Sequence, residues 1–212
     1  MPHDDFAFEP VKGLPELPPE GERILWQGRP DWWALARESL NLYWVAGYFV
    51  LLAAWRFVAV VDRMTLTEAL SVSTPFLVMG LIVCALLAVL AWVQARATVY
   101  TITNRRVAMR VGAALTVTLN LPYTQIANAT LDLRRRGTGT IALELLGDTR
   151  LSYLVCWPHV RPWHFRTQPA LRCIPDAKAV AELLADAAEA RVSTPEIKRS
   201  TPSHDGTAVA AE

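Results

Sequence analysis

The sequence predicts a membrane α-helical hairpin of two transmembrane helices, joined to a mainly-β domain that ends in an amphipathic helix. Three observations carry this prediction. Two long apolar runs, Leu40–Val61 and Val72–Val93, lie close together. Apolar and polar residues then alternate from about residue 99 onward, and a helical apolar stripe follows near residue 180. The first pattern is typical of membrane spans, the second of antiparallel sheet and the third of a helix with one buried face.

The segments before the first apolar run are predicted to be short or unfolded. Residues 1–22 are rich in proline and acidic residues, which predicts a disordered N-terminal arm. Residues 23–39 are expected to be membrane-proximal, with a short strand at Arg23–Gln27 and then an interfacial helix. Trp32 and Trp33 on that helix are expected at headgroup level, where amphipathic rings are enriched.

Residues 40–95 are predicted to form the two-helix transmembrane hairpin. A helix needs about 20 mostly apolar residues to cross a hydrocarbon core about 30 Å thick. Val72–Val93 contains no charged residue, and Leu40–Val61 contains only Arg56. Ser73-Thr74-Pro75 is expected to start the second helix. For Arg56 two interpretations stay open: its side chain snorkels to the headgroups, or it contacts a partner's transmembrane helix.

The distribution of arginine predicts the orientation of the hairpin. Arginines lie before the first run and after the second: Arg23, Arg29, Arg37, Arg96, Arg105, Arg106 and Arg110. The connecting loop offers only Arg63. Because cytoplasmic flanks carry the excess of basic residues, we expect a multi-pass membrane protein with both termini in the cytoplasm; in a bacterium the membrane would be the inner one.

Residues 96–192 are predicted to form the β domain and its C-terminal helix. Strands are expected at residues 99–102, 107–111, 115–121, 129–134, 141–145 and 151–155. Strict alternation predicts a bent antiparallel sheet, or half-barrel, with one face buried. Residues 157–174 contain three prolines and are expected to be irregular. A helix from Pro175 to about Arg191, with the apolar stripe Val180, Leu183, Leu184 and Ala187, would cover the open end of the sheet. Residues 193–212 are expected to be a disordered tail.

Composition and motifs argue against several classes of function. The net charge of +1 gives no overall field to recruit nucleic acid, so no nucleic-acid partner is expected. The three cysteines are few and odd in number, and Cys84 lies in a span, which indicates reduced thiols. Nucleophile-elbow, zinc-protease and dinucleotide-binding motifs do not occur. We therefore expect a protein that is not an enzyme, with no catalytic residue, no cofactor and no metal.

The segment after residue 156 carries the candidate partner-binding residues: Trp157, Pro158, His159, Arg161, Trp163, His164 and Arg166. Tryptophan supplies large contact area, proline lowers the entropy lost on binding, and arginine forks to carboxylates or phosphates. The alternative is a loop folded over the open barrel edge, with the tryptophans in the core. The spacing of the histidines with Cys156 and Cys173 is not a common zinc pattern. Surface or hydrogen-bonded loop histidines are the default, with magnesium ligation in a bacteriochlorophyll as an alternative.

A run of three arginines, Arg134, Arg135 and Arg136, precedes the predicted Gly137-Thr138-Gly139 turn. At a hairpin tip such a run is either solvated or in contact with anionic lipid headgroups, where each arginine contributes about 1 kcal/mol. The glycines are not a phosphate cradle, because no helix and no suitably spaced lysine follow.

Two sequence stretches resemble known families. Tyr100–Gly112, with its Thr-Asn-Arg turn, and Gly21–Pro30 resemble the opening of bacterial PH domains and the stretch that precedes their membrane hairpins. The resemblance implies a PH-like β domain. Cys156–Phe165 and Gln168–Asp176, in an otherwise matching order of segments, are similar to the photosynthetic complex assembly proteins of purple bacteria, the PuhB type.

The second resemblance implies an assembly factor for the photosynthetic reaction centre and core light-harvesting complex. Its partners would be the subunits of those complexes, and its location the intracytoplasmic photosynthetic membrane. The hairpin would dock on client helices through the small residues Gly47, Ala53, Ala54, Gly80 and Ala88. Two alternatives stay open: a generic membrane-bound module that binds lipids or peptides, and a protein that binds or delivers bacteriochlorophyll. An open sheet edge and small-residue spans are also compatible with homo-oligomers.

Overall fold

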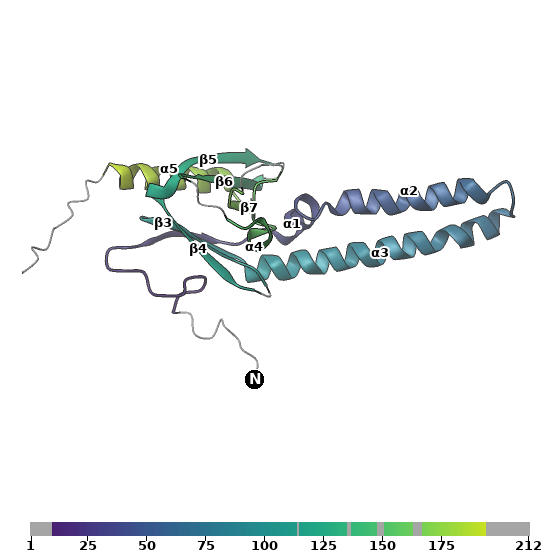
Figure 1. Ribbon diagram of the computed structural model, residues 1–212, viewed down its shortest axis with the longest axis horizontal. Helices are drawn as coiled ribbons and strands as arrows, with labels where there is room; N and C mark the ends of the chain where they lie inside the picture. Colours follow the sequence, from purple (N-terminus) through teal and green to yellow (C-terminus); the bar gives the residue numbers. More distant parts are fainter. Residues whose placement is uncertain (1–9, 114, 135–136, 148–150, 163–166, 194–212) are drawn as a thin grey trace, which may run out of the picture.

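The computed structural model describes residues 10–113, 115–134, 137–147, 151–162 and 167–193 (Figure 1). Two long helices project side by side from one end of a body made of two small sheets and a covering helix. This arrangement confirms the predicted fold class of an apolar helical hairpin with a β domain and a C-terminal helix.

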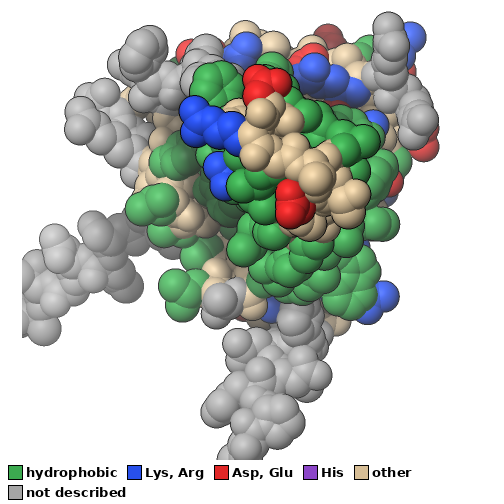
Figure 2. Space-filling model, turned by 90° about the vertical axis from the view of Figure 1, so that its right-hand side faces the viewer, with side chains coloured by type: hydrophobic (Ala, Val, Ile, Leu, Met, Phe, Trp, Pro, Cys, Tyr) green, Lys and Arg blue, Asp and Glu red, His purple; other side chains and the backbone are tan. Residues whose placement is uncertain are grey.

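The hairpin consists of α2 (Leu42–Val60) and α3 (Leu66–Ala97). Both helices are long and apolar enough to cross a membrane, and nearly nine-tenths of each apolar stretch is not buried within the protein. Figure 2 looks at the molecule from the free end of the hairpin and shows hydrophobic side chains over most of that face.

Helix α3 starts earlier than the sequence suggested. Thr65 is its N-cap: the Glu68 side chain accepts from Thr65 N at 3.0 Å, and Thr65 Oγ1 accepts from Glu68 N at 3.5 Å. This reciprocal capping box satisfies two backbone donors at the true helix start. The expected start at Ser73-Thr74-Pro75 is therefore wrong, and Pro75 lies inside the helix.

The first sheet is built from segments on both sides of the hairpin. Its antiparallel order is β1 (Ile24–Gly28), β2 (Val99–Thr103), β3 (Arg106–Val111) and β4 (Val117–Pro122). Because β1 precedes the hairpin and pairs with β2, which follows it, the hairpin is an insertion between neighbouring strands. The short helix α1 (Trp32–Glu38) connects β1 to the hairpin, and Asp31 caps it by accepting from Ala34 N at 2.7 Å.

The second sheet contains one strand that the sequence did not predict. Its antiparallel order is β5 (Ile126–Leu133), β6 (Gly139–Leu145) and β7 (Ala170–Ile174), and a short 3-10 turn, η1 (Tyr123–Gln125), joins the two sheets. The expected strand at 151–155 is wrong, since Tyr153–Cys156 forms the short helix α4. All five residues of β7 are buried, so the strand lacks the alternation that marks a half-exposed strand.

The core lies between the two sheets and α5 (Ala177–Val192). Val180, Leu184 and Ala187 of α5 are buried in it, and Leu183 is half-buried. Each buried aliphatic side chain of valine or leucine size contributes about 1.5–3 kcal/mol to stability. The predicted apolar stripe therefore fixes α5 over the sheets and closes the body at the end away from the hairpin (Figure 1).

Candidate functional site

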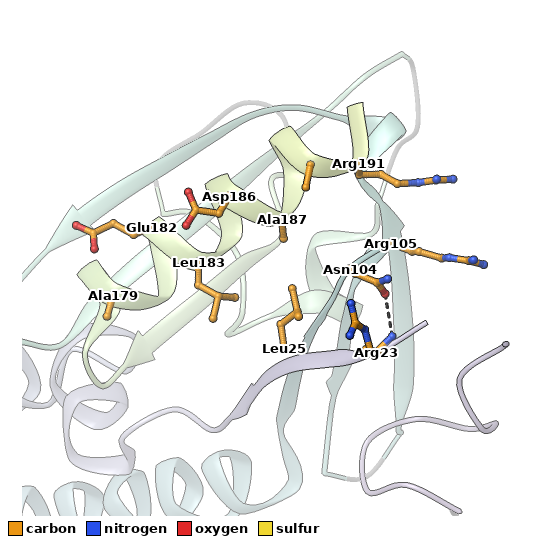
Figure 3. A pocket seen from close by; sticks show the side chains of 11 residues that line it. Arg23, Leu25, Asn104, Arg105, Ala179, Glu182, Leu183, Asp186, Ala187 and Arg191 are labelled. Atoms are coloured by element: carbon orange, nitrogen blue, oxygen red, sulfur yellow. Dashed lines mark hydrogen bonds between the residues drawn. The ribbon is translucent and has the colours of Figure 1, made fainter. Parts of the chain in front are cut away.

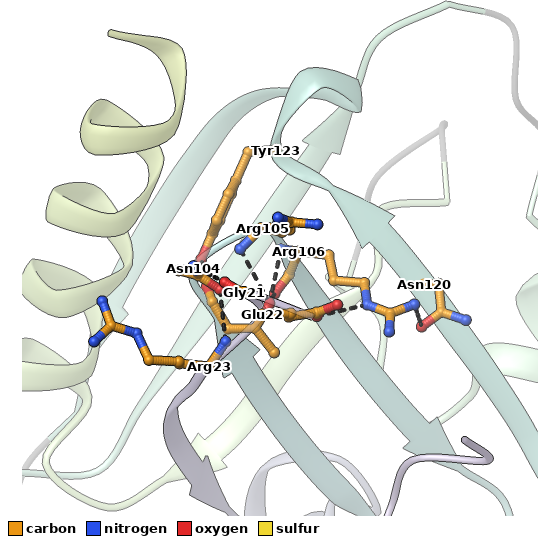
Figure 4. A network of polar contacts seen from close by, with 9 residues as sticks. Gly21, Glu22, Arg23, Asn104, Arg105, Arg106, Asn120 and Tyr123 are labelled. Carbon is orange, nitrogen blue, oxygen red and sulfur yellow. Dashed lines mark hydrogen bonds and ion pairs between the residues drawn. The ribbon is translucent and has the colours of Figure 1, made fainter. Parts of the chain in front are cut away.

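The two stretches that resemble bacterial PH domains bind each other across the base of the first sheet (Figure 4). Asn104, in the turn between β2 and β3, donates from its backbone N–H to Arg23 O at 3.1 Å. Its side chain accepts from Arg23 N at 2.8 Å and donates to Gly21 O at 2.9 Å. One asparagine thus satisfies three backbone groups of the segment that leads into β1.

The neighbouring residues of this turn also form hydrogen bonds within the protein. Thr103 Oγ1 accepts from the backbone N–H groups of Arg105 and Arg106 at 3.1 and 3.0 Å. Tyr123 donates its hydroxyl to Thr103 O at 2.7 Å, and burial raises the pKa of Tyr123 well above its usual range. Arg106 Nε donates to Glu22 Oε1 at 2.9 Å. The Thr-Asn-Arg-Arg motif is therefore the clasp that holds β1 onto the sheet.

A groove of about 780 Å³ runs beside this clasp, between α5 and the ends of β1 and β2 (Figure 3). Glu182, Asp186 and Arg191 line its α5 side, and Arg23 and Arg105 line the opposite side. Leu25 and Leu183 add apolar surface, as do three alanines of α5. Because β1 is the edge strand of its sheet, the groove has the shape and the chemistry to take an extended polypeptide.

A buried polar network joins the hairpin to the body. His159 is 1% exposed, and its two ring nitrogens lie 2.9 Å from Thr98 Oγ1 and 2.6 Å from Tyr100 Oη. Thr98 is the residue between α3 and β2, and its hydroxyl donates to Gln94 O at 2.8 Å. Tyr100 Oη accepts from Arg172 N at 3.2 Å. One chain of hydrogen bonds therefore connects the end of α3 to β2 and β7.

The directions of these bonds fix the protonation of His159. Because Thr98 Oγ1 donates its proton to Gln94 O, it accepts from His159 Nε2–H, and in the neutral ring Nδ1 then accepts the hydroxyl proton of Tyr100. A second proton on the ring would leave the hydroxyl proton of Tyr100 without an acceptor. Burial, with the guanidinium of Arg172 as a lesser cause, lowers the pKa of His159 to about 3. The imidazole is neutral at physiological pH.

Arg172 and Cys173 of β7 extend the network to α1. The Arg172 guanidinium donates to Pro158 O at 3.3 Å and to Glu38 O at 3.3 Å. Asp31 N donates to Cys173 O at 2.7 Å. Burial, assisted by the carboxylate of Glu38, raises the pKa of the Cys173 thiol to about 12. Helix α1, which leads into the hairpin, is therefore bonded directly to β7.

The structure places the described part of the candidate loop mostly inside the protein. Trp157 is half-buried against the base of the hairpin, and Pro158 and His159 are buried. Arg161 Nη1 donates to Gln168 Oε1 at 3.2 Å, beside an isolated bridge between Val160 and Pro169. With both ring nitrogens bonded inside the protein, His159 would have to break one bond to ligate a pigment. Trp163, His164 and Arg166 lie outside the described residues.

The other candidate residues lie near the hairpin. Arg134 is half exposed and lies 3.0 Å from Asp132 Oδ2 and 3.6 Å from Glu38 Oε2, which brings the β5–β6 turn beside α1. Residues 135–136 lie outside the described part. Arg56 is half-buried one turn before the end of α2, and no ion pair of this residue occurs within the described part of the chain.

The small residues of the hairpin differ in burial, and Ala88 is half-buried. Gly80 and Ala53 are buried, and a Cβ at Gly80 would lie 2.6 Å from Phe49 Cβ. These two residues let α2 and α3 pack closely. Gly47 and Ala54 are exposed, with open space around Gly47, so they remain available to another helix.

Sequence reasoning missed the His159 network and the groove. The partners of His159 lie 59 and 61 residues away in the chain, so no local pattern joins them. The nearest signal is a polar residue, Arg172, within a short apolar stretch that is bounded by prolines.

Comparison with known proteins gives three similarities. Residues 42–188 match the family model described as Bacterial PH domain. A Rhodobacter capsulatus protein named "Uncharacterized 23.7 kDa protein in puhA 5'region" is 48% identical over 200 residues, which cover 93% of this chain and 94% of that protein. Among solved structures, a DUF1696 family protein with a pleckstrin-homology domain from Shewanella loihica is 12% identical, with a TM-score of 0.29. That match covers 43% of this chain and 71% of the other.

Proposed function

The chain belongs to the bacterial PH domain family, and from this membership we propose that it is a membrane-anchored, non-enzymatic assembly factor for the photosynthetic reaction centre and core light-harvesting complex. The observation that carries the proposal is the Rhodobacter capsulatus relative, which matches nearly the full length of this chain and is named for its position 5′ of the reaction-centre gene puhA. Genes for a complex and for its assembly factors are often neighbours in bacteria.

In this proposal the hairpin spans the inner, photosynthetic membrane and the β domain lies on the cytoplasmic side. Most of the side chains on α2 and α3 point away from the protein, including Leu51, Trp55 and Leu81. In a bilayer these side chains face lipid or the helices of a client. The exposed Gly47 and Ala54 allow close approach of a client helix, whereas Ala53 and Gly80 hold the hairpin together.

The buried network of Thr98, Tyr100, His159 and Arg172, which we call the junction network, supports a scaffolding role. A client helix bound to α3 would act on a helix whose end is hydrogen-bonded to His159 through Thr98. The β domain is thereby held in one orientation relative to the hairpin, so a client bound at the membrane and one bound at the domain would be brought together in fixed geometry. Such positioning requires only that the clients bind, and it needs no chemical reaction.

The test uses a phototrophic host in which the gene is deleted. We expect a loss of assembled core complex, measured by near-infrared absorbance of the membranes and restored by the full chain. A photo-crosslinking residue at Trp55, which is 76% exposed, should capture reaction-centre or light-harvesting subunits in the complemented strain. A crosslinker at Glu189 on α5 is the matched control. Normal core complex in the deletion strain, with no client captured at Trp55, would overturn the proposal.

The groove beside the clasp favours a second candidate, a membrane-bound module that binds a peptide with both acidic and basic residues. Leu25→Glu would place a carboxylate in the groove, and Leu17→Glu is the control at an exposed site that does not line it. If the groove is the binding surface, only Leu25→Glu should reduce the recovery of cytoplasmic partners in a pull-down. Equal recovery with both variants would exclude the groove.

A further inference from the structure

The short helix α4 (Tyr153–Cys156) presents an apolar surface that no described part of the protein covers. Leu154 is 85% exposed, and Tyr153 and Val155 are 48% and 47% exposed. In contrast, Cys156 is buried and Trp157 is half-buried, so the helix is anchored at its C-terminal end. Three consecutive apolar side chains in water are unfavourable, which indicates that this turn has a partner.

The anchoring contacts place α4 at the base of the hairpin. Trp157 packs against the buried cluster of Ala36, Leu40, Leu42 and Ala91. Ala36 lies on α1, Leu42 is the first residue of α2, and Ala91 lies in the C-terminal part of α3. Figure 1 shows α4 at the end of the body that faces the hairpin. The exposed side chains of α4 therefore lie near the level at which both long helices enter their apolar stretch.

Other exposed aromatic residues also lie at the base of the hairpin. Trp32 and Trp33 of α1 are exposed, and so are Tyr43 and Trp44 in the first turn of α2. Arg96, in the last turn of α3, lies over the Trp92 ring at 4.6 Å. Tryptophan and tyrosine gather at headgroup depth, and arginine is attracted there by anionic lipids. Helix α4 therefore lies at the same junction of body and hairpin as α1 and the first turn of α2 (Figure 1).

We infer that α4 is a third membrane-contact element, which inserts Tyr153, Leu154 and Val155 into the boundary between headgroups and acyl chains of the bilayer that holds the hairpin. The inference rests on the proposed membrane-spanning role of the hairpin. Lipid fits this surface because it consists of exposed apolar side chains and lies at the base of the hairpin, where α1 and α2 also expose tryptophan and tyrosine. With α4 seated, the β domain would lie against the membrane rather than extend from it.

The experiment measures lipid contact in the full chain. Single cysteines replace Leu154, Trp44 and Glu189 in a Cys84→Ala background, and each is labelled with an environment-sensitive fluorophore. Cys156 and Cys173 are buried, and labelling of the background protein alone corrects for them. The proteins are reconstituted in phosphatidylcholine–phosphatidylglycerol vesicles that carry nitroxide at the headgroup or on the acyl chain. Trp44 reports on the hairpin, and Glu189, in the last turn of α5, reports on the end of the body away from the hairpin.

We expect fluorescence loss at positions 154 and 44 with headgroup or shallow acyl-chain nitroxide, and little loss at 189. If the label at position 44 is quenched, whereas the label at position 154 is as little quenched as the one at position 189, the inference about α4 is wrong and the hairpin assignment stands. If 44 is not quenched, the hairpin does not lie in the bilayer, and both proposals fail together. Protection of 154 only after addition of native photosynthetic membrane proteins would assign α4 to a protein partner and would also overturn the inference.

Discussion

His159→Gln tests whether the junction network makes the protein sensitive to acid. In the folded protein burial lowers the pKa of His159 to about 3, whereas an unfolded histidine titrates near 6.5. The lowered folded value means that this contribution to stability is complete above pH 6.5 and is lost as the pH falls toward 3. From about pH 7.5 to about pH 5 the loss amounts to about 2 kcal/mol in the free energy of unfolding, because one pKa unit is 1.36 kcal/mol.

Glutamine can accept and donate hydrogen bonds but does not titrate. Its cost in stability is therefore the same at both pH values, and the difference between wild type and variant isolates the proton on His159. The assay is denaturant unfolding of the full chain in detergent, followed by near-ultraviolet circular dichroism at the two pH values. The other histidines are present in both proteins and cancel. If the variant loses as much stability between the two pH values as the wild type does, His159 is not a buried neutral imidazole and the assigned bond directions are wrong.

Three further predictions concern the hairpin, the clasp and a buried thiol. Gly80→Ala should destabilise the hairpin by about 1–3 kcal/mol, because its Cβ would lie 2.6 Å from Phe49 Cβ, whereas Gly47→Ala should be neutral or stabilising; thermal denaturation in detergent compares the two. Asn104→Ala should cost about 1–3 kcal/mol and accelerate amide exchange in β1, since two backbone groups lose their partners, whereas Asn128→Ala on β5 should leave exchange in β1 unchanged. Cys173 should resist maleimide at about pH 8 until the protein is unfolded, because burial raises the pKa of its thiol to about 12; mass spectrometry with and without denaturant counts the labels.

The sequence predicts those elements whose signal is local. The hairpin follows from apolar composition alone, and β2 to β6 follow from the alternation of apolar and polar residues along the sequence, although β2 is itself fully buried. Strand β7 has one polar residue, Arg172, among four apolar ones, so its five residues give too little alternation to predict a strand. The alternation of Leu151, Tyr153 and Val155 is too short to distinguish a strand from a helical turn, and two of these side chains are exposed on α4.

The candidate site was less predictable, because its contacts join distant segments. Asn104 and Arg23 are 81 residues apart, yet the asparagine side chain completes the backbone bonds of the segment before β1. A conspicuous group of aromatic, proline and histidine residues predicted a binding loop, and the structure uses Trp157 and His159 from that group to join the hairpin to the body. Conspicuous residue types indicate that a segment matters, but only the contacts say whether they face a partner or the core.

The insertion of the hairpin between β1 and β2 constrains how the protein can lie in a membrane. These two strands are hydrogen-bonded from Ile24 and Thr103 to Gly28 and Tyr100, so the segments that enter and leave the hairpin must be on the same side of any bilayer that it crosses. This constraint is independent of the arginine distribution, which predicts that the shared side is the cytoplasm. It also means that insertion of only one of the two helices would leave β1 and β2 on opposite sides of the membrane, because β2 follows α3 after the single residue Thr98. The first sheet can form only when both helices cross or neither does, so the topology of the hairpin and the folding of the β domain are linked by the order of the chain.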